Sequence, residues 1–354
     1  MLVIGIIGAG SISDCHIEPY LNTKKCRIKA IADLNLDLAK AKAEKYGIEN
    51  AYADYKEILN DKEIDAVSIV TPTFTHCNIV KEALEAGKHI LCEKPPALNA
   101  EQTRECAKLA EKSGKLLMYA FVCRFRSHMQ YMKQYMDAGK MGKVVSAEAV
   151  RMHLCDKTGG WFLNKSRSGG GPLIDANIHE IDSILYLMGY PKVKMVVGCT
   201  SQVNSDLPSK VKGIINNGWV SSDVNTYDRT VENVASGYVV FENGAYLFIK
   251  TSTVLNVLKE ETYMEICGEK AGVRMEPLVP GSELKMVEVT DDNYIREVNP
   301  VIENVQVYQE QVNHFVDCCI NGTECICKND EAVKLMEIID AIYKSAETGE
   351  PVIF

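Results

Sequence analysis

Three short segments of the sequence hold residue types that could bind a nucleotide or move protons. They are Gly8-Ala9-Gly10, Glu93-Lys94-Pro95, and the run from Gly169 to Asp182. Glycines let backbone approach a pyrophosphate closely, and a lysine can stabilise developing negative charge. An imidazole beside carboxylates is suited to proton transfer near neutral pH. Together they point to chemistry on a small molecule that binds beside a nucleotide.

The first segment resembles a dinucleotide-binding turn. Residues 8–13 match the pattern G-x-G-x-x-G/A except at the last position, where Ser13 stands. The first glycine permits a tight turn, the second admits the pyrophosphate, and the amides that follow face its negative charge. We predict that Gly8, Gly10, Ser11 and Ile12 bind the cofactor. Ser13 should loosen the packing of the following helix slightly without abolishing binding.

Asp33 supports this interpretation and indicates which cofactor binds. It ends the second expected strand 23 residues after Gly10, near the spacing of about 20 typical of a ribose-binding acid. Its carboxylate can accept hydrogen bonds from both ribose hydroxyls but would repel a 2′-phosphate. Leu34 and Asn35 supply no compensating cation. We therefore predict NAD rather than NADP.

Two further strand ends carry unusual residues, which are Thr71-Pro72 with His76 and Glu93-Lys94-Pro95. In an open parallel sheet the carboxyl ends of the strands line the ligand crevice, so these residues are predicted to bind the cofactor. Pro95 restricts the backbone of Lys94 and could help to aim its side chain into the site. The alternative is that Lys94 is a surface lysine at a turn.

The third segment places Asp175, His179 and Asp182 at i, i+4 and i+7. On one continuous helix this spacing puts all three on the same face, where the imidazole could transfer protons beside the carboxylates. The alternative is a helix N-terminus whose acidic residues favour the helix dipole, with His179 as a paired surface group.

The elements that must position these residues alternate in the first third of the chain. Short apolar runs predict strands, and segments of helical period, each followed by a stop glycine, predict helices. The strands are expected at 2–7, 28–32, 66–70, 89–92 and 116–119, and the helices at 36–46, 75–86 and 100–111. This order predicts an α/β fold that begins with a Rossmann-type, doubly wound parallel sheet.

After about residue 120 long strands dominate, as in an antiparallel sheet. The strands are expected near 144–153, 195–203, 233–241, 245–254, 263–267 and 284–289, and the helices near 127–138, 175–188, 307–319 and 330–348. Residues 206–225 are expected to form a loop. We predict a nucleotide-binding domain at 1–120 and a second domain at 121–354.

Composition narrows the class of protein. A net charge of -9 without a basic cluster opposes nucleic acid or an anionic membrane as partner, and no apolar run is long enough to span a bilayer. The odd count of 13 cysteines and the lack of a secretory leader indicate free thiols in the cytoplasm. Cys318, Cys319, Cys325 and Cys327 lack the paired spacing of zinc sites, so we expect buried residues near a helix end and no metal.

Together these motifs resemble the Gfo/Idh/MocA family, named for glucose-fructose oxidoreductase, inositol dehydrogenase and a rhizopine-catabolism protein. The matched features, which span nearly the whole chain, are the glycine turn, Asp33, Thr71-Pro72 to His76, Glu93-Lys94-Pro95, Arg124-Phe125, and the glycine run that leads to Asp175 and His179. Asn177, where the family often has glycine, and Pro96 depart from its pattern.

The resemblance implies a Rossmann domain followed by an α/β domain whose large, open, mainly antiparallel sheet often mediates oligomer formation, here a homodimer or homotetramer. It also implies that Lys94 contacts the reacting oxygen, that His179 is the acid/base, and that Asp175 assists it. The expected activity is reversible hydride transfer between NAD and a secondary hydroxyl of a sugar, a cyclitol or a sugar derivative.

Weaker candidates for contact with substrate are Arg124, His153, Trp161 and Asp182. Trp161 could stack on a sugar face, although a single tryptophan is more often a packing residue. Arg124 fits a structural or cofactor-side role better than a catalytic one.

Two other functions stay open at this point. The first is oxidation at C3 of a glycoside, which acidifies the neighbouring proton and leads to loss of the C1 substituent without lasting NADH. The second is a non-catalytic sensor of NAD or sugar, because a fold alone does not establish chemistry.

Overall fold

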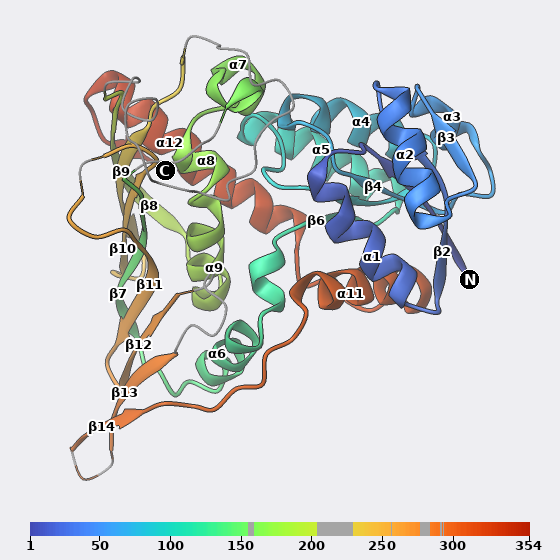
Figure 1. Ribbon diagram of the computed structural model, residues 1–354. Coiled ribbons are helices and arrows are strands. Elements are labelled where there is room, and N and C mark those ends of the chain that lie inside the picture. The colour runs from blue at the N-terminus through green and yellow to red at the C-terminus, as the bar shows by residue number, and fades with distance from the viewer. Residues whose placement is uncertain (155–158, 204–228, 256, 277–283, 291, 293) are drawn as a thin grey trace. The chain divides into compact units, whose positions relative to one another are not determined.

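The computed structural model describes residues 1–154, 159–203, 229–255, 257–276, 284–290, 292 and 294–354 (Figure 1). The chain divides into two compact units. The first comprises Met1–Phe125 and Gln306–Val333, and the second comprises Arg126–Val305 and Lys334–Phe354. The expected loop at 206–225 lies outside the described residues.

This division differs from the two continuous domains that the sequence suggested. The first unit extends to Phe125, and residues 306–333 return to it from the far end of the chain. They return because helix α11 (Val307–Asn321) packs against α1 (Asp14–Asn22) and against the short 3-10 helix η2 (Val122–Phe125). A helix that folds back over such a distance leaves no local pattern in the sequence.

The first unit contains the predicted parallel sheet, with six strands in the order β3-β2-β1-β4-β5-β6. The strands are β1 (Leu2–Ile7), β2 (Cys26–Ala32), β3 (Asn50–Tyr52), β4 (Ala66–Ile69), β5 (His89–Cys92) and β6 (Leu117–Tyr119). All neighbouring pairs are parallel, which confirms the Rossmann-type arrangement. Only the short edge strand β3 was not expected.

The helices of this unit follow the expected order, apart from the short α3 (Lys56–Asn60), which was not predicted. Besides α1, α3 and α11 they are α2 (Leu36–Tyr46), α4 (Thr73–Glu85) and α5 (Ala100–Ser113). The side chains of Asn35 and Asn99 cap α2 and α5 at their N-termini, and Gly47 and Gly114 end these helices with left-handed backbone. These local signals explain why the helix limits could be predicted.

The second unit is built on a mixed sheet of nine strands in the order β14-β13-β12-β11-β7-β10-β9-β8-β15. The strands are β7 (Val144–Met152), β8 (Val193–Ser201), β9 (Val234–Phe241), β10 (Tyr246–Ser252), β11 (Glu261–Gly268), β12 (Ala271–Met275), β13 (Lys285–Val289), β14 (Ile295–Val298) and β15 (Val352–Ile353). The pair β10–β7 is parallel, and the other neighbouring pairs are antiparallel. The mainly antiparallel sheet is therefore confirmed.

The described helices of the second unit are α6 (Ser127–Asp137), α7 (Lys165–Ser168), α8 (Pro172–Asp175) and α9 (Ile178–Met188), together with most of α12 (Asn329–Thr348). Gly198 and Gly237 let α12 approach the sheet, since a Cβ on either would lie within 2.6 Å of Ile342. The opposite face carries half-exposed aromatic residues such as Tyr238 and Phe248. None of the described helices is both long and apolar enough to cross a membrane.

Candidate active site

The glycine turn joins β1 to the 3-10 helix η1 (Ser11–Ser13), which leads into α1. Gly8 has a φ of +107°, and a Cβ there would lie 2.5 Å from the Val70 carbonyl oxygen. A side chain at Gly8 is therefore excluded by the protein itself. Around Gly10, in contrast, a Cβ would meet no protein atom within 4 Å. The open space at Gly10 leaves room for a pyrophosphate to approach the backbone closely, as dinucleotide binding requires.

Ser13 fits the turn better than expected. Its side chain is buried, and its hydroxyl donates a hydrogen bond of 2.6 Å to the Gly10 carbonyl oxygen. The serine therefore fastens the start of α1 to the turn, and we see no sign of the looser packing that the sequence suggested. Ser11 and Ile12 lie in η1, so their amides follow Gly10 directly.

Asp33 connects the end of β2 to the same turn. One carboxylate oxygen accepts the Ala9 amide and the other accepts the Asn35 amide, both at 2.8 Å. The side chain is half-buried, and each carboxylate oxygen can accept a further hydrogen bond. Asp33 thus holds the turn in place while it can still receive ribose hydroxyls.

His76 on α4 joins two of the predicted segments. Its ring nitrogens lie 2.8 Å from the Thr71 and Pro95 carbonyl oxygens, and its side chain is 1% exposed. Burial lowers the pKa of His76 below its ordinary value. Neutral imidazole donates to one of the two carbonyls at a time. His76 therefore links the backbone of Thr71 to that of Pro95, at the sheet edge where the cofactor is predicted to bind. Both of its ring nitrogens are occupied by these contacts.

A buried network supports Glu93 at the end of β5. The carboxylate of Glu93 lies 2.9 Å from Nε2 of His16, whose Nδ1 lies 3.3 Å from the Ser68 hydroxyl. The Tyr20 hydroxyl reaches the same serine at 2.9 Å. Burial by itself would raise the pKa of Glu93, but the hydrogen bond and charge of His16, together with Lys94, lower this pKa below its ordinary value. Glu93 is therefore an anion in the interior.

Lys94 follows directly on this network. Its amide donates to the Glu93 carboxylate at 3.1 Å, and its side chain is half-buried. The anionic Glu93 thus fixes the backbone of Lys94, and Pro95 follows it through a cis peptide bond. His16, Ser68 and Tyr20 were not predicted from the sequence, although the i, i+4 spacing of His16 and Tyr20 on α1 was a signal that could have linked these two.

In the second unit, the expected helix at 175–188 is two helices. Asp175 ends α8, and His179 lies in the first turn of α9, with Asn177 between them. The backbone amide of Asn177 donates a hydrogen bond to the Pro172 carbonyl oxygen, five residues earlier. A regular α-helix bonds four residues back, so the helical turn is wider here. The prediction of one continuous helix is therefore wrong, while Asp175 and His179 are both partly exposed and a shared face for them stays a prediction.

Buried carboxylates hold this break in place. Glu180 is fully buried and pairs with Arg151 at 3.1 Å, and Arg151 also donates to the Ala176 carbonyl oxygen at 3.3 Å. Glu232 accepts the Gly171 amide at 2.9 Å and the Tyr343 hydroxyl at 2.8 Å. Burial raises the pKa of Glu232. None of these carboxylates was selected from the sequence, because their partners are distant along the chain.

The glycine run before α8 is required by packing. A Cβ on Gly171 would lie 2.0 Å from the Glu232 carbonyl oxygen, which is backbone and has little room to move. We expect Gly171→Ala to destabilise the protein by about 1–3 kcal/mol, the usual cost of overpacking. Gly159→Ala is the matched control, because a Cβ there meets nothing within 4 Å. Thermal unfolding should show a lower Tm for the first variant alone, and equal Tm values would contradict the packing role.

Two of the weaker candidates have structural partners. Asp182 is 1% exposed and accepts the Tyr190 hydroxyl at 2.7 Å. Arg124 has no exposed surface, donates to the Ile326 carbonyl oxygen at 2.6 Å and pairs with Glu331. Burial therefore opposes contact with substrate for both side chains. For Arg124 it favours the structural role that the sequence allowed.

His153 and Trp161 remain partly exposed in the second unit. His153 follows β7, where its Nδ1 lies 3.8 Å from a carboxylate oxygen of Glu260 and its Nε2 lies 3.4 Å from the Thr262 hydroxyl. Trp161 stacks on Phe162 with ring centroids 3.8 Å apart, in the 3-10 helix η3 (Gly160–Leu163). These contacts leave a role in binding substrate as a prediction for both residues.

A Rossmann-type parallel sheet with an open glycine turn, a carboxylate bonded to that turn and a lysine after β5 is typical of a nucleotide-dependent oxidoreductase. Comparison with known families agrees. The model described as "Oxidoreductase family, NAD-binding Rossmann fold" matches residues 2–121, and its partner, "Oxidoreductase family, C-terminal alpha/beta domain", matches residues 133–354. The chain therefore belongs to the Gfo/Idh/MocA oxidoreductase family and has an NAD-binding Rossmann domain.

Curated relatives match over almost the full length. The D-glucoside 3-dehydrogenase of Escherichia coli is 33% identical over 98% of this chain and 96% of its own. The inositol 2-dehydrogenase of Rhizobium meliloti is 28% identical over 96% of each chain. Among solved structures, a levoglucosan dehydrogenase in complex with NADH and levoglucosan has a TM-score of 0.85 at 23% identity and covers 99% of each chain. This structural likeness confirms the fold.

Proposed function

We propose that the protein is an NAD-dependent dehydrogenase that oxidises a secondary hydroxyl of a sugar, a cyclitol or a sugar derivative, and reduces the corresponding ketone in the reverse direction. One observation carries the proposal furthest. The buried His16–Glu93 pair fixes the backbone of Lys94 at the carboxyl end of β5, where a Rossmann sheet binds its ligand. A surface lysine at a turn would need no such support.

The family context and elementary chemistry assign roles to three side chains. His179 takes the hydroxyl proton during oxidation and returns it during reduction. The ammonium group of Lys94 stabilises the negative charge that develops on the substrate oxygen. Asp175 assists His179. When bound, the nicotinamide supplies the hydride acceptor at C4.

The residues of the first unit would hold the cofactor. Gly8 and Gly10 admit the pyrophosphate beside the amides of Ser11 and Ile12, and Asp33 receives the ribose hydroxyls. Thr71, Pro72, His76 and Glu93 shape the edge beside Lys94. The residues present therefore fit NAD.

The names of the relatives narrow the substrates worth testing. They include dehydrogenases of a glucoside, of inositol and of levoglucosan, all of which carry several secondary hydroxyls. We infer that this protein acts on the same class, and D-glucosides are the first choice because that relative is 33% identical over nearly the whole chain. A panel of glucosides, free sugars and cyclitols with NAD tests this inference. NADH formation with at least one of them supports it, whereas no turnover of any would oppose it.

A second candidate function deserves a direct comparison. One relative is named D-glucoside 3-dehydrogenase, and oxidation at C3 is also the first step of a reaction that would cleave a glycoside. The C3 ketone acidifies the C2 proton; loss of this proton and of the C1 substituent would give a 1,2-alkene, water would add at C1, and the hydride would return to C3 so that NAD is restored. Product analysis alongside NADH absorbance separates the two cases, because cleavage leaves no lasting NADH.

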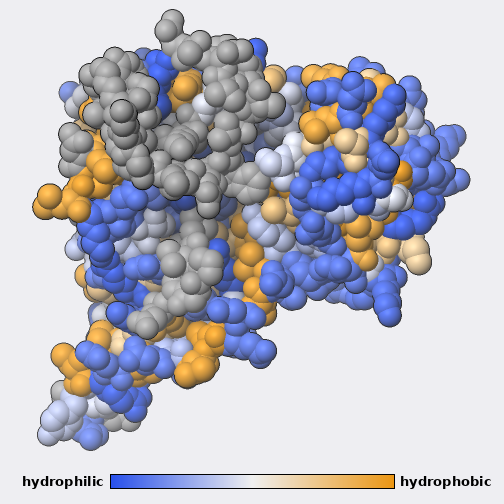
Figure 2. Space-filling view, viewed as in Figure 1, coloured by the Kyte–Doolittle hydropathy of each residue, from blue (hydrophilic) through white to orange (hydrophobic). Residues whose placement is uncertain are grey.

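We also propose that the exposed face of the nine-stranded sheet binds a second copy of this chain. Tyr238 and Phe248 are directly opposite each other on β9 and β10, and both are 38% exposed. At the other end of the sheet, hydrophobic residues gather on the surface over β13 and β14 (Figure 2), where Val287 and Ile295 are 43% and 77% exposed. The strand register places these two apolar groups on the same face of the sheet, and exposed apolar groups on one face favour an interface.

This interface has a simple test in the mass of the protein in solution. Phe248→Glu places a charge on this apolar surface, so we expect a dimer or tetramer to become largely monomeric by light scattering. Lys40→Glu, an exposed position on α2 in the first unit, is the control and should leave the mass unchanged. A wild-type protein that is already monomeric would contradict the proposal.

The described cysteines are free thiols. Disulfides are rare in reducing compartments, and we propose the cytoplasm as the location of the protein.

A further inference from the structure

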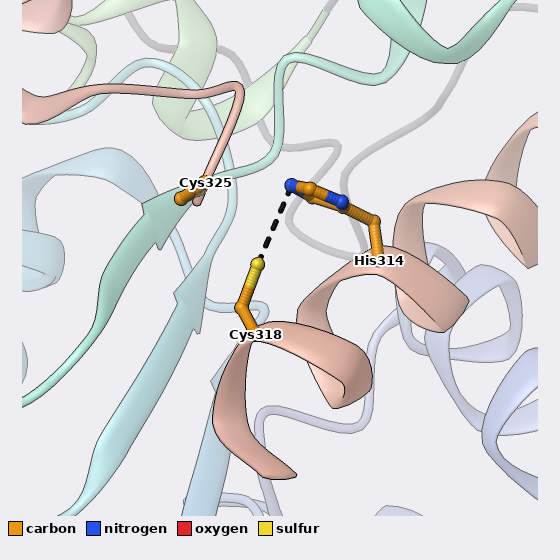
Figure 3. A group of neighbouring side chains, drawn as sticks. All are labelled: His314, Cys318 and Cys325. Atoms are coloured by element: carbon orange, nitrogen blue, oxygen red, sulfur yellow. Dashed lines mark hydrogen bonds between the residues drawn. The ribbon is translucent and has the colours of Figure 1, made fainter. Parts of the chain in front are cut away.

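The first unit contains a cluster of metal-ligating side chains that the proposed oxidoreductase chemistry does not use. His314 and Cys318 lie one helical turn apart on α11, and Cys325 comes from the segment after that helix (Figure 3). One imidazole nitrogen and the two sulfur atoms all lie within 4.8 Å of one another. Among the described residues, this is the group of three such side chains that is close enough to share an ion.

The surroundings hold the three side chains in place. The His314 ring packs against Phe125 with centroids 5.4 Å apart. The segment that carries Cys325 is fixed by the buried Arg124 guanidinium, which donates to the Ile326 carbonyl oxygen at 2.6 Å. The Cys325 thiol lies 3.5 Å from the Cys327 carbonyl oxygen. The cluster therefore joins a packed helix to an anchored segment, and both belong to the same unit.

The donor set and its spacing suit zinc. Two thiols and an imidazole are ligands that zinc prefers, with Zn–S near 2.3 Å and Zn–N near 2.0 Å. A sulfur and a nitrogen on one tetrahedral zinc are then roughly 3.5 Å apart. The distance from Cys318 Sγ to His314 Nε2 is 3.4 Å. The other two distances are at most 4.8 Å, so the ligand atoms need only approach one another to reach tetrahedral spacing.

Cysteine binds zinc as the thiolate, so binding of the ion releases the protons of the two thiols to solvent.

We propose that His314, Cys318 and Cys325 bind one zinc ion, with water in the fourth position. The cysteine spacing alone predicted no metal, because the third ligand is a histidine on the preceding helix turn. His314 Nε2 also accepts the Ile326 amide at 3.1 Å, so zinc must displace this hydrogen bond. Three ligands and this competition make a reversible site, which ties the end of α11 to the segment that leads into α12.

The full-length protein tests the site directly. The protein is freed of metal with a chelator under reducing conditions, given one equivalent of zinc, and desalted. We expect about one zinc per chain by elemental analysis, and an absorption band from sulfur-to-cobalt charge transfer when cobalt replaces zinc. Cys325→Ser and His314→Gln should each lower the retained zinc at least ~10-fold. Cys319→Ser is the matched control, because Cys319 adjoins Cys318 but lies outside the cluster.

A second measurement guards against a variant that merely folds poorly. Zinc in excess should raise the Tm of the wild-type protein and of Cys319→Ser by a few degrees, as expected when a ligand binds only the folded state. The Tm of Cys325→Ser should not change. Cys325 lies outside any helix or strand, so its replacement should preserve the fold. Equal zinc retention in wild type and Cys325→Ser, or no retention in wild type, would overturn the proposal.

Discussion

Replacing Lys94 or His179 with alanine is expected to lower kcat by about 10²- to 10⁴-fold while NAD still binds. General acid–base catalysis contributes about this much, and loss of a group that stabilises developing charge costs about 10²- to 10³-fold. The two residues lie in different units, yet each should be indispensable to the same reaction. Activity is measured with the best substrate of the panel, and NADH affinity by calorimetry.

Matched variants make this result interpretable. Lys40→Ala on α2 and His128→Ala on α6 remove the same side chains elsewhere in the same units, and both should leave kcat within about twofold of wild type. An NADH affinity that falls along with kcat would indicate lost binding rather than lost chemistry. Near-normal turnover in both Lys94→Ala and His179→Ala would show that the proposed roles are wrong.

Asp33→Ala is expected to weaken NAD binding by about 10- to 100-fold and to narrow the preference for NAD over NADP. Hydrogen bonds to a charged group contribute about 1.5–3 kcal/mol each, and about 1.4 kcal/mol is a factor of ten. The carboxylate of Asp33 also repels a 2′-phosphate, so its loss should penalise NADP much less. A relative from Haloferax volcanii is named for NADP(+), so this preference has to be measured for each chain.

Calorimetry with both cofactors gives the answer for Asp33. Asp37→Ala is the matched control, because Asp37 is exposed in the first turn of α2, only four residues further along the chain. It should bind both cofactors as wild type does. A wild-type protein that binds NADP more tightly than NAD would contradict the assignment of Asp33. Equal losses for both cofactors in Asp33→Ala would mean that its bond to the Ala9 amide is its main role.

Much of the nucleotide-binding unit could be predicted because its signals are local. The strand Leu2–Ile7 and the helix Leu36–Tyr46 have the limits that the sequence indicated. Each is set by an apolar run or a cap within a few residues. The short strand β3 was missed because three half-buried residues at a sheet edge give no periodic signal.

The residues that support the candidate site were beyond sequence reasoning. Glu93 was found through its neighbour Lys94, but its partner His16 lies 77 residues earlier along the chain. Glu232 braces Gly171 across 61 residues. Such pairs are created by the fold, and a single sequence contains no pattern that connects them.

The helix expected at 175–188 shows what a periodic pattern misses. The spacing suggested one continuous helix, but α8 ends at Asp175 and α9 begins at Ile178. Asn177 is fully buried, and its side-chain amide donates a hydrogen bond to the Ala149 carbonyl oxygen at 3.4 Å. Tertiary contacts therefore accompany the break. The family often has glycine where this chain has Asn177. The break lies two residues before His179, the acid/base candidate.

Hydride transfer itself is tested most directly with an isotope. A D-glucoside deuterated at every ring carbon is incubated with the wild-type protein and NAD, and the dinucleotide is analysed by mass spectrometry. The account predicts NADH that carries one deuterium, formed by wild type and lost in His179→Ala. Nicotinamide that stays free of deuterium across the whole panel of deuterated glucosides, sugars and cyclitols would contradict it.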